Sequence, residues 1–258
     1  MRLLFLCLLC LLCLLPAQLA WARSGCATPL RVGFDNWPPY HYYQQDGERR
    51  RLHGFSVDYL NAVATRLGCR LVYVERPWKR VLQDLAQGRL DIAMEAYFYD
   101  DRARYAWFST AYNPGRSALW VRKSDSYAEL DLASWLARGY KLGVTKDYYY
   151  GAEIAGLLQR HRGQVSEVND AQNYRKLLLG RVDGFLGDIL ATPWGLKREG
   201  LAEGIVPHVM RVYETPSYFM LSKKTLSSDF VQRFNQAIEA VGKSDEHVLI
   251  WRRYAPAR

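Results

Sequence analysis

The hydrophobic residues of the chain follow two rhythms: short apolar runs typical of buried strands, and stripes at helical spacing. In the first half, apolar runs at 31–35, 71–75 and 91–94 predict strands. Helical stripes over 57–67 and 78–86 lie between them, and each is followed by a glycine that suits a helix end. The order β-α-β-α-β predicts a parallel sheet joined by right-handed crossovers.

A long segment of different composition separates the first predicted strand from the first predicted helix. Residues 36–54 read NWPPYHYYQQDGERRRLHG and are rich in proline, glycine and charged residues. That composition predicts a loop without regular structure.

The second half of the chain repeats the organisation of the first. Apolar runs at 140–144, 165–168 and 182–188 predict strands, and helical stripes around Ile154 and Tyr174 lie between them. A local likeness supports the repeat, because QGRLDIAM and LGRVDGFL each place Arg-x-Asp between a helix-ending glycine and an apolar strand. Two halves of roughly 90 residues each suit two small α/β lobes.

Two extended segments connect the predicted halves. Residues 113–123 lead out of the first half and residues 213–224 lead back. A last helix, capped by Ser227 or Ser228, carries an apolar stripe made up of Phe230, Phe234, Ile238 and Val241. We therefore expect two lobes and two hinges, with residues 23–115 and 213–258 in the first lobe and residues 116–212 in the second.

The N-terminal residues have the features of a secretory signal. A basic residue precedes an apolar run over 3–15, and residues 20–22 fit the A-x-A cleavage pattern. The run is shorter than the roughly 20 apolar residues of a membrane-spanning helix, although a retained anchor is the alternative. Residues 1–22 are therefore predicted to be a signal peptide, which would place the mature protein in the periplasm.

Two cysteines, Cys26 and Cys69, follow the predicted signal peptide. An even pair in an exported chain favours one disulfide. Each cysteine lies just before a predicted strand, and neighbouring parallel strands would bring the two together. The alternative is a pair of buried thiols, because the sequence alone does not fix the distance between their Cα atoms.

The charge and the histidines exclude several classes of function. The net charge is +9, but the basic residues are scattered, with one dense cluster at 48–51. We expect weak steering of anions and no nucleic-acid partner. The histidines are dispersed, at positions 41, 53, 161, 208 and 247, and no H-E-x-x-H, G-x-S-x-G or P-loop pattern occurs. No metal site or cofactor is expected.

Five stretches, in order along the chain, resemble one protein family. They read RVGFDNWPPY, HGFSVDYLNAVATRLGC, ERPWKRVLQDLAQGRLDIAM, DDRARYAWFSTAY and GRVDGFLGD. Through them the chain resembles the periplasmic solute-binding proteins of the polar amino-acid type, family 3 of the bacterial extracellular binding proteins. Each stretch is weakly specific alone, and their order and spacing make the resemblance strong.

This resemblance implies an α/β, two-lobed periplasmic-binding-protein-like fold of type II with two crossover hinge segments. It implies binding of a small polar solute, such as an amino acid or a related carboxylate or amine, by closure of the lobes. A membrane permease or a separate sensor would be the partner, and the protein would be a monomer. The alternative from a different class is an enzyme of the cyclohexadienyl or prephenate dehydratase type, which some members of the fold resemble.

A free amino acid offers a carboxylate, for which the planar guanidinium fork of arginine is the best partner. The resemblance places the carboxylate-binding arginine six positions before Phe108 of the F-S-x-x-Y motif, which is Arg102. Arg104 is out of register and is expected at the surface. The alternative for Arg102 is an ion pair at the surface with Asp100 or Asp101.

Other groups of an amino acid need other partners. The resemblance implies that Asp188 binds the ammonium, although this aspartate could instead cap the following helix. Trp37 and Trp78 match positions whose aromatic rings enclose the ligand side chain, with core packing as the alternative. Tyr40 and Asp35 are weaker candidates from the same loop as Trp37.

The sequence departs from the family pattern at bulky or charged positions. Glu95 and Tyr97 stand where small hydroxyl residues are usual, and Tyr148 or Tyr149 stands where Ser or Thr is usual. These side chains would narrow the cleft. Glu95 could contact a cationic group of the ligand or pair with Arg102, and it is the one carboxylate that could serve as the acid of a dehydratase. No residue is assigned a catalytic role.

Overall fold

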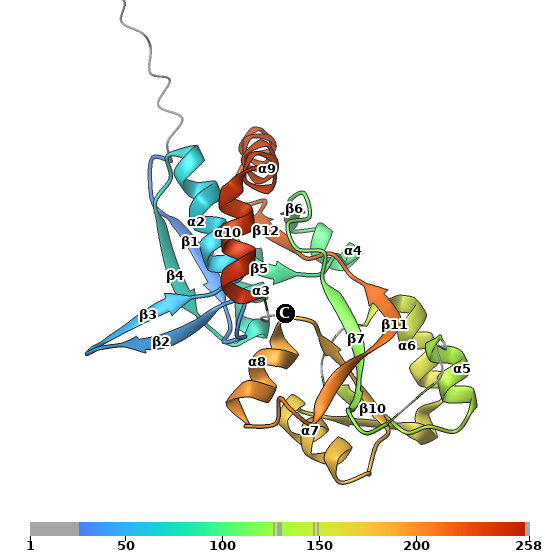
Figure 1. The fold of residues 1–258 in the computed structure, drawn as a ribbon. Coiled ribbons are helices and arrows are strands. Elements are labelled where there is room, and N and C mark those ends of the chain that lie inside the picture. Colours follow the sequence, from blue (N-terminus) through green and yellow to red (C-terminus); the bar gives the residue numbers. More distant parts are fainter. Residues whose placement is uncertain (1–25, 126, 128–130, 147, 149, 256–258) are drawn as a thin grey trace, which may run out of the picture.

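The computed structural model describes residues 26–125, 127, 131–146, 148 and 150–255. The predicted signal peptide and Tyr149 lie outside the described residues. Figure 1 shows two lobes, each built on a five-stranded sheet. The two-lobed α/β class predicted from the sequence is confirmed.

The sheet of the first lobe has the strand order β4-β1-β5-β12-β6. Its strands are β1 (Leu30–Phe34), β4 (Leu71–Glu75), β5 (Ile92–Ala96), β6 (Ala106–Phe108) and β12 (Tyr218–Ser222). The predicted parallel unit is present, because β1 pairs in parallel with both β4 and β5. The last strand, β12, returns from the second lobe and pairs antiparallel with β5 and β6.

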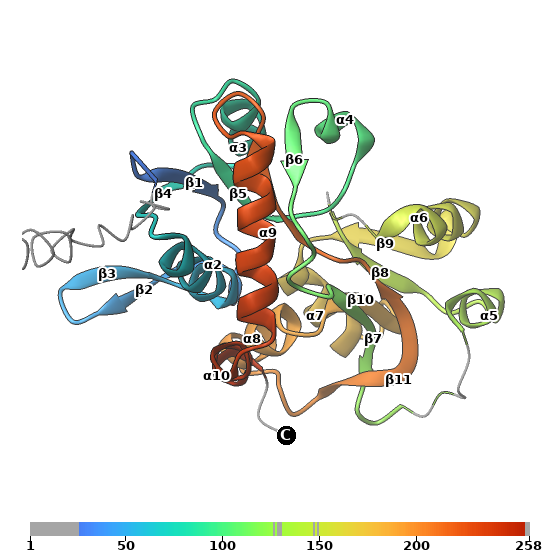
Figure 2. The same ribbon diagram turned by 90° about the horizontal axis from the view of Figure 1, so that it is seen from above.

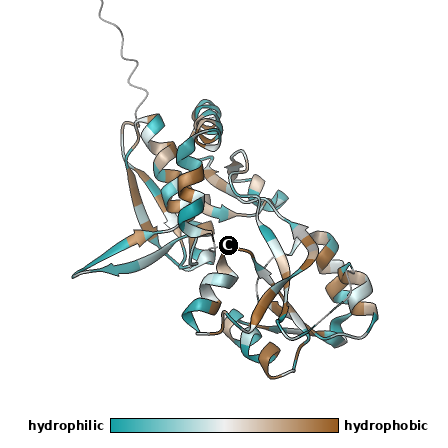
Figure 3. Cartoon of the chain, in the orientation of Figure 1, coloured by the Kyte–Doolittle hydropathy of each residue, from teal (hydrophilic) through white to brown (hydrophobic). Residues whose placement is uncertain are grey.

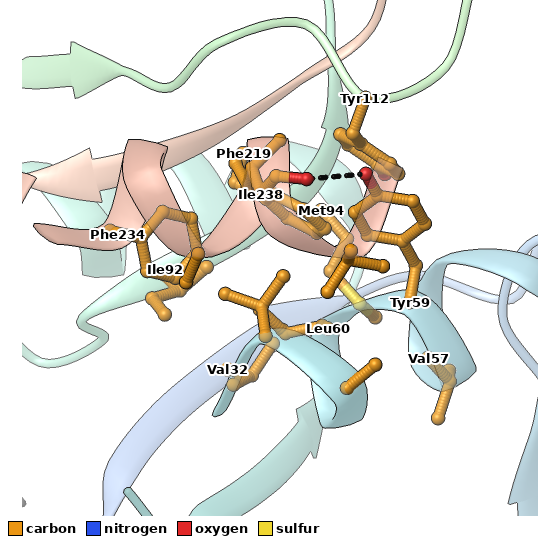
Figure 4. Close-up of a cluster of buried hydrophobic side chains, with 14 of the residues drawn as sticks. Val32, Val57, Tyr59, Leu60, Ile92, Met94, Tyr112, Phe219, Phe234 and Ile238 are labelled. Carbon is orange, nitrogen blue, oxygen red and sulfur yellow. Dashed lines mark hydrogen bonds between the residues drawn. The ribbon is translucent and has the colours of Figure 1, made fainter. Parts of the chain in front are cut away.

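Helices cover both faces of the first sheet. On one face lie α2 (Phe55–Leu67), α9 (Ser228–Gly242) and α10 (Asp245–Tyr254), and on the other lies α3 (Trp78–Ala86). Because side chains alternate along a strand, Val32 and Phe34 pack toward α2 and α9, whereas Gly33 faces Val81 of α3. Figure 4 shows the cluster of buried side chains between the sheet and the helices α2 and α9, which includes Val32. Figure 2 shows α9 lying across the lobe.

The disulfide between Cys26 and Cys69 is present, with Cα atoms 4.8 Å apart. The register of β1 and β4 explains it, since Leu30 lies opposite Leu71 and each cysteine lies shortly before its strand. The sequence prediction of a bridge between neighbouring parallel strands is confirmed.

The sheet of the second lobe has the order β11-β7-β10-β8-β9. Its strands are β7 (Arg116–Arg122), β8 (Leu142–Thr145), β9 (Val165–Val168), β10 (Gly184–Asp188) and β11 (Ile205–Glu214). Its helices are α5 (Leu132–Ala137), α6 (Gly151–Arg160), α7 (Asp170–Leu178) and α8 (Ala191–Arg198), with a short 3-10 turn at Arg162–Gln164. The helices α5 and α6 pack on one face, and α7 and α8 on the other.

The two chain segments that join the lobes pair with each other. The amide of Thr215 donates to the carbonyl of Gly115 at 2.8 Å, and the amide of Ser217 donates to the carbonyl of Asn113 at 2.9 Å. Gly115 has φ +57, and a Cβ atom there would lie 1.9 Å from the carbonyl oxygen of Thr215. Only glycine fits this close crossing of the two connections.

The expected loop at 36–54 is partly wrong. It contains a β-hairpin of β2 (Tyr42–Asp46) and β3 (Arg49–His53), which turns at Gly47 with φ +60. The hairpin projects from the first lobe and is largely hydrophilic (Figures 1 and 3). Because most of its residues are exposed, it lacks the apolar alternation by which a half-buried strand is recognised.

Within the described part of the chain, no helix has both the length and the apolar character to span a membrane.

Candidate functional site

A cavity of about 330 Å³ lies between the two lobes. The first lobe lines it with Asp35, Trp37, His41, Trp78, Met94, Glu95, Tyr97, Tyr99 and Arg102, and the second with Thr145, Tyr148 and Asp170. Its volume is at the lower end of the range for small-molecule sites, about 300–1,000 Å³. Five tryptophan and tyrosine residues and one arginine among these side chains suit a solute that is partly apolar and partly anionic.

Arg102 lies on the short helix α4 (Asp100–Ala103), and its guanidinium is held by three groups of the cavity wall. One N–H donates to the backbone carbonyl of Tyr97 at 3.0 Å. The guanidinium lies over the rings of Tyr99 and Trp78, at 4.6 and 5.6 Å from their centroids. Burial lowers the pKa of Arg102. Among the described residues, no carboxylate lies within ion-pair distance of it.

Arg104, two residues further on, has a different environment. It pairs with Asp101 at 3.2 Å, and the two side chains are 81% and 86% exposed. The expected surface position of Arg104 is confirmed. Arg102 makes no ion pair with Asp100 or Asp101, so the alternative of a surface pair does not describe it.

The two predicted tryptophans both line the cavity. Trp37 contacts Tyr40 at 4.5 Å between ring centroids and Tyr148 of the second lobe at 6.0 Å. Trp78 begins α3 directly after Pro77. Their roles as ligand contacts remain predictions.

Glu95 is 6% exposed and has φ +50, the one positive φ of a non-glycine residue in the described chain. Its Oε1 accepts hydrogen bonds from Ser56 at 2.5 Å and Tyr112 at 2.6 Å, and its Oε2 accepts one from Asn113 at 3.2 Å. No contact joins Glu95 to Arg102 within the part of the chain that is described. Through these hydrogen bonds, the carboxylate links β5 to α2 at Ser56 and to the start of the first connection between the lobes at Tyr112 and Asn113.

Asp188 ends β10 and accepts three hydrogen bonds. The amides of Leu190 and Ala191 donate to Oδ1 at 2.8 and 2.7 Å, and the hydroxyl of Tyr40 donates to Oδ2 at 2.8 Å. These amides belong to the turn that leads from β10 into α8, whose N-cap position is Leu190 and not Asp188. Burial raises the pKa of Asp188 to about 6, against the lowering effect of its hydrogen bonds. Its role as the ammonium partner remains a prediction.

Aromatic side chains join the lobes across the cleft. The hydroxyls of Tyr97 and Tyr148 lie 2.8 Å apart, and their rings meet edge to face. At the outer edge, Tyr42 of the hairpin contacts Trp194 of α8, with centroids 5.6 Å apart. The phenols at positions 97 and 148 therefore meet across the cleft, and their expected narrowing of it remains a prediction.

Sequence reasoning missed Thr145 and Asp170, the polar residues that the second lobe adds to the cavity. Thr145 ends β8 and Asp170 follows β9, and these two strands are parallel neighbours. Polar groups at the carboxyl ends of parallel strands are the usual ligand contacts of open α/β sheets. Applied to the correctly predicted strand at 165–168, that rule would have indicated Asp170 as a candidate for the site.

No group of three or more potential metal ligands is clustered within the residues that the structure describes.

Two lobes on mixed sheets, joined by two crossing segments around a cavity, define a solute-binding fold. The family model of bacterial extracellular solute-binding proteins, family 3, matches residues 30–257, and the chain belongs to this family. The arginine-binding periplasmic protein of Mannheimia haemolytica is 23% identical over 226 residues, covering 85% of this chain and 87% of that protein.

A second relative is an enzyme and matches a smaller part of the chain. The cyclohexadienyl dehydratase of Pseudomonas aeruginosa is 35% identical over 78 residues, 30% of this chain and 28% of that protein. Among solved structures, an ancestral cationic amino acid solute-binding protein shares the fold with a TM-score of 0.69 at 18% identity, covering 91% of this chain and 97% of that one.

Proposed function

We propose that this protein binds a small amino acid or a related solute in the cavity between its lobes, in the periplasm, through a carboxylate that pairs with Arg102. The observation that carries this proposal is the guanidinium of Arg102. It lines the cavity, is oriented by Tyr97, Tyr99 and Trp78, and has no carboxylate partner within the described chain.

The surroundings of Arg102 favour an anionic group as its partner. The two aromatic rings hold the plane of the guanidinium, so its remaining N–H groups need little reorganisation to bind a carboxylate in a fork. Partial burial weakens the competition from water and strengthens a charge-assisted hydrogen bond. Desolvation destabilises the charged form of Arg102, and an ion pair with a bound carboxylate would offset this destabilisation.

Binding would also hold the lobes together. The cavity takes its lining from both lobes, and a solute that touches both has a higher affinity for the arrangement in which they meet. Membership of the family supports delivery of the solute to a membrane permease or to a sensor.

We infer that the protein is a binding protein rather than a dehydratase. The oxygens of Glu95, the one carboxylate proposed as an acid, are engaged by Ser56, Tyr112 and Asn113. We expect no phenylpyruvate when the protein is incubated with prephenate, measured by absorbance with an authentic dehydratase as the positive control. Formation of phenylpyruvate in proportion to protein would contradict this inference.

The proposed function is tested with Arg102→Ala and its neighbour Arg104→Ala. A thermal-shift screen of the common amino acids first finds the strongest ligand, since a ligand of the folded form raises the melting temperature. Calorimetry then measures its affinity for both variants. We expect Arg102→Ala to weaken binding by about 100-fold, because losing one partner of a buried charge pair has an effect of about 2–5 kcal/mol.

Arg104→Ala is the matched control. It removes the same charge two residues away from Arg102, and the ion pair that it breaks, between Arg104 and Asp101, is exposed. We expect its affinity to stay within about twofold of the unmodified protein, as exposed pairs contribute about 0–1 kcal/mol. Equal losses in the two variants would refute the assignment of Arg102.

A further inference from the structure

The segment that leads into α8 and the helix itself lie on the side of the second lobe that faces the first lobe (Figure 1). Asp188 accepts a hydrogen bond from Tyr40 of the first lobe. Leu190 is 2% exposed and belongs to a cluster of buried side chains that the first lobe otherwise forms. Further along, the indole of Trp194 contacts the ring of Tyr42 in the hairpin, with centroids 5.6 Å apart. The second lobe therefore meets the first at three successive points.

The outermost of these contacts, between Tyr42 and Trp194, lies outside the ligand cavity. Neither residue is among those that line the cavity with Arg102. Both side chains are partly buried, yet within the described part of the chain neither belongs to a hydrophobic core cluster of its own lobe. The two rings are therefore not part of the core of either lobe, and their contact joins the lobes.

The alternation of side chains along β2 explains why Tyr42 points toward α8. Neighbouring residues of a strand point to opposite faces, so Tyr42 and Tyr43 point away from each other. The ring of Tyr43 contacts Phe34 of its own lobe at 5.9 Å between centroids, and the guanidinium of Arg50 lies over it at 4.4 Å. Tyr42 is left on the face of the hairpin that meets the second lobe.

The helical periodicity of α8 places Trp194 toward the hairpin. The residues Thr192, Gly195 and Leu196 are buried, and their spacing puts them on one stripe of the helix. Trp194 lies outside this stripe, and the guanidinium of Arg198 lies over its ring at 5.1 Å from the centroid. The indole is therefore held in place on the surface of its own lobe, where the hairpin contacts it.

Beside the ring contact, the hairpin and α8 lie further apart. A space of about 450 Å³ separates them there, and Gln44, Gln45 and Arg198 are among the exposed side chains that line it. Exposed polar side chains contribute little when they approach one another in water. Loss of either ring should therefore remove most of what stabilises this contact.

We infer that the contact between Tyr42 and Trp194 holds the lobes together in the absence of ligand and thereby strengthens the binding of every ligand of the cavity. Separation of the lobes would expose both rings to water, so their contact favours only the joined arrangement. The apparent affinity of a ligand is proportional to the fraction of the protein in the arrangement that binds it. The statement about affinity rests on the proposed function, whereas the statement about the ligand-free protein does not.

Small-angle X-ray scattering of the ligand-free protein is the first test, with the variants Tyr42→Ala and Trp194→Ala. We expect both to have a larger radius of gyration than the unmodified protein, because their lobes separate more readily. Tyr42→Phe keeps the ring and should keep the unmodified value. The double variant Tyr42→Ala/Trp194→Ala should match the single variants, because either substitution already removes the contact.

Calorimetry is the second test, with the two L-amino acids that raise the melting temperature most in the thermal-shift screen. We expect both amino acids to bind about 3- to 10-fold more weakly to Tyr42→Ala and to Trp194→Ala, which is the range that an aromatic pair contributes. The ratio of the two affinities should stay within about twofold of its unmodified value, because neither ring touches the amino acid.

Tyr43→Ala is the matched control, because it removes the same side chain one residue away. The contacts that it breaks lie within the first lobe, where Tyr43 packs against the core cluster. We expect this variant to have a lower melting temperature, with the radius of gyration and both affinities unchanged. The control therefore separates a loss of stability from a loss of contact between the lobes.

The outcomes keep this inference apart from the proposed function. An unchanged radius of gyration in both Tyr42→Ala and Trp194→Ala would overturn the inference, and so would an equal increase in Tyr43→Ala. A loss of affinity for only one of the two amino acids would identify the ring as a ligand contact and would also overturn it. If no amino acid binds, the proposed function fails, and the scattering still decides whether this contact holds the lobes together.

Discussion

Glu95 has a backbone conformation that residues with a side chain rarely adopt, in the middle of a buried network. A left-handed conformation raises the free energy of such a residue by about 1–2 kcal/mol. Three donors from two distant segments engage its carboxylate, and its own amide donates to Tyr112 at 3.2 Å. Each hydrogen bond to a charged group contributes about 1.5–3 kcal/mol. The stabilisation from these hydrogen bonds is therefore larger than the free energy by which the left-handed backbone destabilises Glu95.

We predict that Glu95→Gln lowers the free energy of unfolding by about 2–3 kcal/mol, because the amide nitrogen of glutamine cannot accept from Ser56, Tyr112 or Asn113 and leaves a buried donor unsatisfied. Unfolding in guanidinium chloride measures the change. Glu203→Gln, at an exposed position, is the control and should differ by less than about 0.5 kcal/mol. Equal stability of the two variants would show that the network contributes nothing.

At the scale of residues, the sequence predicted roles that depend on local register better than roles that depend on distant partners. The position of Arg102 relative to Phe108 distinguished it from Arg104, and the structure places these arginines in different environments. The partners of Glu95 and Asp188 could not be predicted. Tyr40, for example, is 148 positions away from Asp188 and reaches it only because the lobes meet.

At the scale of elements, the disulfide joins the beginnings of two neighbouring strands, β1 and β4. It closes a loop of 43 residues that contains the whole hairpin and α2. A crosslink across such a loop reduces the conformational entropy of the unfolded chain, which stabilises the folded one.

We predict that the double variant Cys26→Ala/Cys69→Ala is less stable than the oxidised protein by about 4 kcal/mol, the value that loop-closure entropy gives for this length. Unfolding in guanidinium chloride measures the difference. The unmodified protein should approach the stability of the variant once a reductant is added, and the variant should not respond to the reductant. Equal stability of oxidised protein and variant would refute a structural role for the bridge.

The sequence predicted elements well where one face is buried. The strands at 71–75 and 165–168 and the helix at 78–86 have the predicted bounds, and Ser227 caps α9 by accepting from the amide of Phe230. The hairpin was missed, because exposed strands carry no apolar pattern and because a composition rich in Pro and Gly is also typical of loops.

At the scale of the molecule, the repeated β-α order of the two halves was enough to predict two lobes and two connections. The contacts between the lobes were not predictable, because they depend on how two separately folded sheets are placed. Tyr40 with Asp188, and Tyr97 with Tyr148, show how specific this placement is. The first of these contacts includes Asp188, and burial raises the pKa of its carboxyl to about 6.

The titration of Asp188 gives the contact between the lobes a pH dependence. Burial raises its pKa to about 6, and the charge of nearby Glu95 acts in the same direction. If the lobes separate and water reaches Asp188, its pKa should return toward the ordinary value of about 3.9. Burial also raises the pKa of Tyr40, so its hydroxyl remains a donor throughout. The joined arrangement therefore binds a proton more tightly than the separated one.

We predict that the lobes of the ligand-free protein separate more readily as the pH rises through about 6. A raised pKa in the joined state favours that state fully below about pH 4, and this contribution, at most about 3 kcal/mol, is lost above pH 6. Small-angle X-ray scattering at pH 5 and pH 7.5 should give a larger radius of gyration at the higher pH. Asp188→Asn does not titrate and should remove the difference. A difference of equal size in that variant would assign the pH dependence to other groups.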